Sequence, residues 1–77
     1  MKRGRGVERR PGVLAGKPVV RGTRIPVELL AELVEAGWTV EQILREYPTL
    51  TREDIEEALE AARLLRAQRR EAAAAEA

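Results

Sequence analysis

The sequence has no cysteine and no histidine, and its 77 residues include one tryptophan, one tyrosine and no phenylalanine. Without cysteine the chain cannot form a disulfide, and without either residue it lacks the usual ligands of a structural zinc site. A domain this small buries only roughly 60% of the surface that its unfolded chain exposes, so a single copy would be marginally stable. Self-association is therefore expected, and the sequence predicts a homo-oligomer.

Serine is also absent, so the common catalytic nucleophiles and general bases are missing. Carboxylates are abundant at positions 53–57, but they fall in the first turns of a predicted helix, where the macrodipole favours negative charge. Acid–base catalysis would need them in a desolvated cleft that shifts their pKa. We therefore expect no enzymatic activity, no cofactor and no metal site.

Long apolar runs are missing too. None is long enough for the core of a signal peptide or for a membrane span. The expected location is cytoplasmic, with no membrane among the partners.

Charge is distributed unevenly along the chain. Residues 1–27 hold eight lysines and arginines and one glutamate, a net charge of +7, whereas residues 28–77 hold six arginines and twelve acids, a net charge of −6. A polyanion would be attracted to the first part and repelled by the second. The amino-terminal part therefore suits a polyanion such as nucleic acid.

Residues 1–10 are rich in glycine and arginine, and after Met1 their single apolar side chain is Val7. Such a segment cannot bury enough surface to become ordered, so we predict a flexible basic arm over residues 1–10. A single domain is predicted over residues 11–66.

The stretch GKPVVRGTRIPV, residues 16–27, is typical of a short β-hairpin. β-Branched residues flank the glycine-containing turn Arg21-Gly22-Thr23. Pro18 and Pro26 cannot donate hydrogen bonds to a ladder, so they are expected to bound the strands. The pattern predicts a hairpin over residues 18–25.

After Pro26 the apolar residues recur with the helical period of about 3.6. Gly37 is expected to end the first helix, Thr39 and Gln42 form the pattern of a capping box, and Thr51 is expected to cap a further helix. Three helices are predicted, over residues of about 27–36, 40–46 and 52–66, followed by an exposed alanine-rich helical tail over 67–77. The predicted fold is mostly α, a short amino-terminal β-hairpin followed by a three-helix bundle of helix-turn-helix type.

The last two helices have lengths typical of a helix-turn-helix motif, whose second helix enters the major groove of DNA. Here Arg52 is the only cation in the first turns of that second helix, and the same turns carry five acids: Glu53, Asp54, Glu56, Glu57 and Glu60. Unless these acids point away, phosphates would repel them. This helix is a poor candidate for DNA recognition.

Candidate nucleic-acid-binding residues lie instead in the basic arm and the hairpin: Arg9, Arg10, Lys17, Arg21 and Arg24. Side chains alternate between the two faces of a hairpin, so these arginines face outward if the valines and Ile25 face the core. The same charges would also protect an exposed strand edge against aggregation. Both interpretations are kept.

A two-stranded ribbon is marginal in water on its own. Pairing its edge with a second copy across a two-fold axis would complete a small sheet and bury apolar side chains. The predicted dimerisation residues are Val19, Val20 and Ile25.

Three elements, Gly-Lys-Pro, Arg-Gly-Thr-Arg-Ile and Tyr-Pro-x-Leu, occur in this order within GKPVVRGTRIPV and AGWTVEQILREYPTLTREDIEEAL. Over residues 11–65 the chain resembles the small bacterial and archaeal family known as domain of unknown function 433. The resemblance implies a homeodomain-like three-helix fold with an amino-terminal β-element and no catalytic residues. It also implies an antitoxin-like role, inferred mostly from genes encoded beside a small nuclease-like toxin.

The combined hypothesis is a homodimeric antitoxin of a type II toxin–antitoxin pair that binds a nuclease-like toxin. An extended version of this hypothesis adds binding to its own operator DNA. Arginines of the last helix and tail would pair with carboxylates of the toxin's metal site. The candidate toxin-binding residues are Arg63, Arg66, Arg69 and Arg70. The alternative is a homodimeric protein-interaction module that does not bind DNA.

Overall fold

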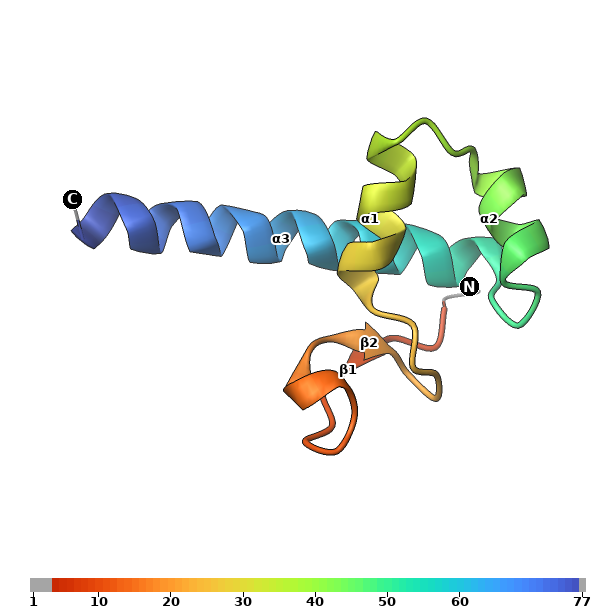
Figure 1. The fold of residues 1–77 in the computed structure, drawn as a ribbon, viewed down its shortest axis with the longest axis horizontal. Coiled ribbons are helices and arrows are strands. Elements are labelled where there is room, and N and C mark those ends of the chain that lie inside the picture. Colours follow the sequence, from red (N-terminus) through yellow and green to blue (C-terminus); the bar gives the residue numbers. More distant parts are fainter. Residues whose placement is uncertain (1–3, 77) are drawn as a thin grey trace.

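The computed structural model describes residues 4–76, which form a small β-element and three helices (Figure 1). In chain order these are strand β1 (Val7–Glu8), the 3-10 turn η1 (Leu14–Gly16), strand β2 (Val19–Val20) and helices α1 (Val27–Glu35), α2 (Val40–Glu46) and α3 (Arg52–Glu76). The predicted fold class is confirmed, since a two-stranded antiparallel sheet precedes three helices.

Strand β2 pairs with a different strand from the one predicted. β1 and β2 run antiparallel, with Val7 opposite Val20 and Glu8 opposite Val19. On the other side of β2, the predicted hairpin is reduced to an isolated bridge from Val19 to Pro26 and a 3.0 Å hydrogen bond from Val20 N–H to the Ile25 carbonyl. A second hydrogen bond, from the Val27 N–H to the Pro18 carbonyl over 3.1 Å, closes this bridge, and the chain enters α1 at Val27. The regular partner strand of β2 is β1, on its opposite edge.

Residues 4–10 are part of the fold, which differs from the predicted flexible arm; residues 1–3 of that arm lie outside the described residues. The Arg21 N–H donates to the Gly6 carbonyl over 2.9 Å, and the N–H groups of Arg5 and Gly6 donate to carboxylates of α3. The prediction counted apolar side chains alone. Backbone hydrogen bonds to acids far along the chain hold this segment instead.

The helix ends follow the predicted capping chemistry. Gly37 has a φ of 100°, and the N–H groups of Gly37 and Trp38 donate to Val34 and Leu33, each over 3.0 Å, in a Schellman motif that ends α1. Two residues later α2 begins with a complete capping box, in which the Thr39 hydroxyl and the Gln42 side chain each accept the other residue's N–H.

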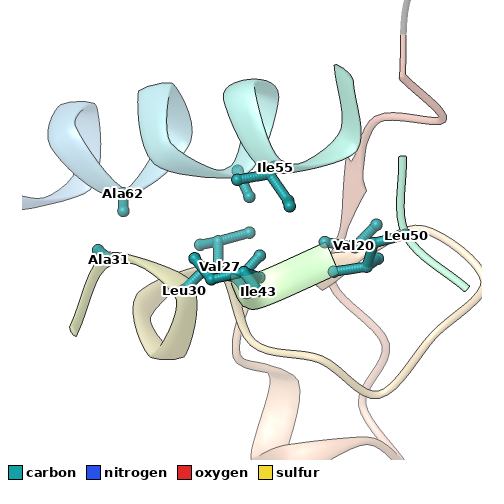
Figure 2. Packing of buried hydrophobic residues seen from close by; sticks show 9 residues of the cluster. Val20, Val27, Leu30, Ala31, Ile43, Leu50, Ile55 and Ala62 are labelled. Atoms are coloured by element: carbon teal, nitrogen blue, oxygen red, sulfur yellow. The ribbon is translucent and has the colours of Figure 1, made fainter. Parts of the chain in front are cut away.

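The core lies where the three helices meet β2 (Figure 2). Leu30 of α1, Ile43 of α2 and Ile55 of α3 are fully buried, and burying each such side chain stabilises the fold by about 1.5–3 kcal/mol. Figure 2 shows Ala31 of α1 facing Ala62 of α3, and these small side chains allow the two helices to approach closely.

Helix α3 is the longest element and projects beyond the other helices (Figure 1). No break marks the predicted boundary between domain and tail at residue 66, because one helix continues to Glu76. The molecule is elongated as a result, with extents of 42 × 30 × 26 Å. Within residues 4–76, no helix combines the length and apolarity needed to cross a bilayer.

Candidate interaction surfaces

Asp54 is the centre of a polar cluster at the start of α3. Its side chain, in a residue only 2% exposed, accepts hydrogen bonds from the N–H groups of Arg5 at 2.9 Å and Thr51 at 3.0 Å. The Asp54 N–H donates to the Thr51 hydroxyl over 3.1 Å, which completes the cap that the sequence predicted at Thr51. The Arg5 guanidinium adds an ion pair, with Nε 3.2 Å from Oδ2.

Residues 4–6, here called the N-terminal strap, lie against this cluster. The Gly6 N–H donates to Glu57 Oε1 over 3.0 Å, and the Arg5 guanidinium donates to the Thr49 carbonyl over 2.6 Å. A Cβ atom on Gly4 would lie 2.6 Å from Glu57 Oε1 and 2.9 Å from the Asp54 nitrogen, closer than real Cβ contacts allow. The strap therefore needs glycine at position 4.

The Asp54 carboxyl is charged at neutral pH. Burial alone would raise its pKa, but the hydrogen bonds from Arg5 and Thr51 and the positive charge of Arg5 outweigh this effect and lower the pKa below its usual value. The charged form is the stronger hydrogen-bond acceptor, so the strap is held by charge-assisted hydrogen bonds.

Sequence reasoning did not identify the strap. The spacing of Thr51 and Asp54 is that of a capping box, and this pattern indicates that the Asp54 side chain points back to the Thr51 N–H. Its other partner, Arg5, lies 49 residues away along the chain, and no local pattern indicates that contact.

Two predicted nucleic-acid-binding residues, Arg10 and Arg21, are engaged within the chain. Each pairs with Glu8 at 3.6 Å. Arg21 Nε also donates to the Arg5 carbonyl over 3.0 Å, and Arg10 Nη2 donates to the Thr23 carbonyl over 2.9 Å. These side chains connect β1 and the strap to the turn after β2, which gives them a structural role.

The other three residues of that predicted set, Arg9, Lys17 and Arg24, are exposed. None of them forms an ion pair with any residue that the structure describes. All three belong to the β-element and its turns, away from α2. The structure thus divides the predicted set into two engaged arginines and three exposed cations.

The surface that a helix-turn-helix motif would present to DNA is acidic. Arg52, the only cation in the first turns of α3, donates to Glu41 of α2 over 2.7 Å, and this hydrogen bond lowers the pKa of Glu41. Asp54 and Glu57 point to the strap, but Glu56 stays exposed. Among the side chains that the structure describes, residues 4–71, no acidic cluster could hold a metal ion.

The four arginines predicted to bind a toxin lie together along a groove between α1 and α3, here called the arginine groove. It has a volume of about 490 Å³ and is lined by Ala31, Leu59, Ala62, Arg63, Arg66, Arg69 and Arg70. Ala31 and Ala62 are buried at the bottom of this groove. Guanidinium groups surround a shallow apolar floor.

Three of these arginines pair with glutamates of the same chain: Arg63 with Glu60, Arg66 with Glu35, and Arg69 with Glu28. The hydrogen bond to Glu35 raises the pKa of Arg66. Solvent screens these largely exposed pairs, so each holds its arginine weakly.

The predicted dimerisation residues are mostly covered within one chain. Val19 and Val20 are 0% and 1% exposed, and Ile25 is half-buried. A second copy is not needed to bury the two valines, so dimerisation through them stays a prediction without support from exposed apolar surface. Among the described residues, the large apolar side chains that are exposed are Leu14, Val34 and Leu64.

The sequence profile of the family described as "Protein of unknown function (DUF433)" matches residues 7–61. The crystal structure of a DUF433 member from Anabaena variabilis ATCC 29413 is similar, with a TM-score of 0.76 and 33% identity over 83% of this chain and 63% of that chain. The uncharacterised protein y4eO of Sinorhizobium fredii is 51% identical over 45 residues, which are 58% of this chain and 20% of that protein. The chain thus spans about a fifth of its curated relative.

Proposed function

The chain belongs to the DUF433 family of proteins of unknown function, and from this premise we propose that it is a non-enzymatic, antitoxin-like protein that binds a nuclease-like partner. The arginine groove is the observation that carries this proposal. Four arginines converge there over an apolar floor, whereas an enzyme would need catalytic side chains in that position.

The chemistry of the groove suits an acidic partner. Arginine pairs with carboxylates in a planar, bidentate geometry, and metal-dependent nucleases hold their divalent ions with clustered carboxylates. An arginine that enters such a cluster would take the position of the metal and stop the nuclease reaction. Arg66 and Arg69 are suited to this role because solvent reaches their ion pairs with Glu35 and Glu28, so that carboxylates of a partner could compete for them.

The test is co-expression with the protein encoded by the adjoining reading frame, followed by pull-down and calorimetric titration. Replacing Arg66 and Arg69 together by glutamine should weaken binding at least about tenfold. Arg45→Gln is the matched control, because it removes an exposed arginine of α2 outside the groove. Equal binding by the groove variant and the wild type would contradict the proposal.

DNA binding is a second candidate function, and the exposed Arg9, Lys17 and Arg24 favour it. Phosphate contacts give a log–log salt slope near −0.9 per neutralised charge, so replacing all three by alanine should reduce the slope by about 2.7. Arg52→Ala is the control, since Arg52 lies on the acidic α2–α3 surface. No measurable binding to duplex DNA at low salt would leave the interaction module that does not bind DNA.

A further inference from the structure

We propose that Glu28 and Glu35 of α1 are internal competitors for the arginine groove, which restrict it to partners that present clustered carboxylates. In the free chain these glutamates pair with Arg69 and Arg66 of α3, respectively. A partner that uses these two arginines must displace both glutamates. This inference rests on the proposed function, since it concerns how the same groove selects its partner.

The two glutamates flank the apolar floor of the groove on its α1 side. Ala31, the α1 residue in that floor, follows Glu28 by three positions and precedes Glu35 by four. With 3.6 residues per turn, these spacings place all three residues along one side of α1, with the glutamates about 10.5 Å apart along its axis. Figure 2 shows Ala31 on the side of α1 that faces Ala62 of α3. Both ion pairs therefore cross from α1 to α3 next to this floor.

The four arginines of the groove differ in what a partner must displace. Arg63 pairs with Glu60, three residues earlier on α3, whereas Arg66 and Arg69 pair across to α1. Arg70 makes no ion pair with any side chain of residues 4–71. A partner carboxylate that binds Arg70 therefore adds an ion pair. One that binds Arg66 or Arg69 exchanges one pair for another.

The charge of the groove is balanced in the free chain. Three of its arginines are paired with Glu28, Glu35 and Glu60, and Glu32 adds a negative charge near Arg66. Opposite charges this close largely cancel at a distance, so an approaching anion meets little net positive charge. A single carboxylate gains little by replacing a glutamate that is already in place.

A cluster of carboxylates can overcome this competition. Once one of its carboxylates has bound Arg70, the others are held near Arg66 and Arg69 at a high effective concentration. The exchange at these two arginines then leaves the number of ion pairs unchanged, and the pair with Arg70 is a net gain. The side chains of Glu28 and Glu35 are already 29% and 58% exposed, so the displaced carboxylates are readily solvated. The groove therefore favours clustered over isolated carboxylates.

Calorimetric titration of the full chain with a hexa-aspartate peptide tests the competition. Glu28→Gln combined with Glu35→Gln should tighten binding about three- to tenfold at low salt, because two arginines no longer have to be released. Glu46→Gln combined with Glu56→Gln is the matched control, since it removes two exposed acids outside the groove and changes the net charge equally. Equal gains in the two double variants overturn the proposal, and so does a first variant that binds no better than the wild type.

The first double variant should keep its fold, because exposed ion pairs contribute little to stability, and circular dichroism checks this. Glu35→Gln alone changes only the exposed last residue of α1 and should give about a two- to threefold gain in affinity. This single variant keeps the test valid if the double variant is unstable.

A second peptide tests the restriction to clusters. It has the same six aspartates, each followed by two glycines, so its side-chain charge is equal but spread out. The wild type should bind it more weakly than hexa-aspartate, and replacing Glu28 and Glu35 by glutamine should reduce this preference at least about twofold. An unchanged preference overturns the proposed restriction.

The competition and the proposed function fail on different variants. If Arg66→Gln combined with Arg69→Gln binds the neighbouring protein as the wild type does, the proposed function is wrong. If that variant loses binding but the removal of Glu28 and Glu35 gives no gain, the groove binds its partner and only the competition is wrong.

Discussion

Arg5 and Asp54 are 49 residues apart in the sequence and make two direct contacts, N–H to Oδ1 at 2.9 Å and Nε to Oδ2 at 3.2 Å. Asp54 also caps α3 through Thr51. One buried carboxylate thus joins the amino-terminal strap, the turn before α3 and the first turn of that helix. We expect these three segments to lose their structure together.

Replacing Asp54 by alanine should lower the free energy of unfolding by about 2–4 kcal/mol, because the change removes the carboxylate that accepts from the Thr51 N–H in the capping box and from the N-terminal strap. Urea denaturation followed by circular dichroism measures this loss. Glu56→Ala, an exposed acid of the same helical turn, should change stability little. Similar losses in both variants would mean that Asp54 acts only through helix charge.

Gly4→Ala should destabilise the fold by about 1–3 kcal/mol, since its Cβ would collide with Glu57 Oε1 and the Asp54 backbone. Gly12→Ala is the control: a Cβ there meets nothing within 4 Å and the φ of Gly12 is not positive, so alanine is tolerated. Thermal melts of the two variants provide the comparison, and equal midpoints would show that the strap does not pack as described.

Stability should depend on pH through Asp54. Its pKa is lowered in the folded chain, so its contribution is complete above the unfolded value of about 3.9 and is lost as the pH falls through the folded pKa. Urea midpoints measured downward from about pH 6 should therefore decrease below about pH 4. Asp54→Asn should have a lower midpoint at neutral pH and a smaller decrease on acidification; parallel curves for the two proteins would assign the acid sensitivity to other groups.

Arg21→Ala should destabilise the fold by about 1 kcal/mol, because it removes the contacts of Arg21 with Glu8 and with the Arg5 carbonyl. The loss should be no larger, since solvent screens these exposed contacts. Arg24→Ala, which removes an exposed arginine from the same turn, should leave the unfolding midpoint unchanged. If the two variants have the same unfolding midpoint, Arg21 has no structural role and is again a candidate for phosphate binding, like Arg24.

Local rules predicted the elements that depend on neighbouring residues. The glycine end of α1, the Thr39–Gln42 capping box and the Thr51 cap are all present, since each needs partners within a few positions. The helical period likewise located the buried side chains of Leu30 and Ile43. The fold class could therefore be predicted from sequence.

Local rules could not predict contacts between residues that are distant in the sequence. Counting apolar residues described the first ten positions as a loose arm, but Gly6 donates to Glu57 across 51 positions and Val7 pairs with Val20. The same limit applies to the candidate sites: the sequence grouped Arg10 and Arg21 with Arg24, and only the folded chain shows that the first two share Glu8. The four arginines of α3 line one groove because helical spacing already places them close together.

The strap has a consequence for how the protein is made. Gly4, Arg5 and Gly6 are translated before their acceptors on Asp54 and Glu57, which follow 49 positions after Arg5 and 51 positions after Gly6. The strap can therefore dock only after the beginning of α3 has left the ribosome, and a product that ends before α3 would leave the strap without its carboxylate partners. We expect the strap of ribosome-bound chains to resist proteolysis only after α3 has emerged.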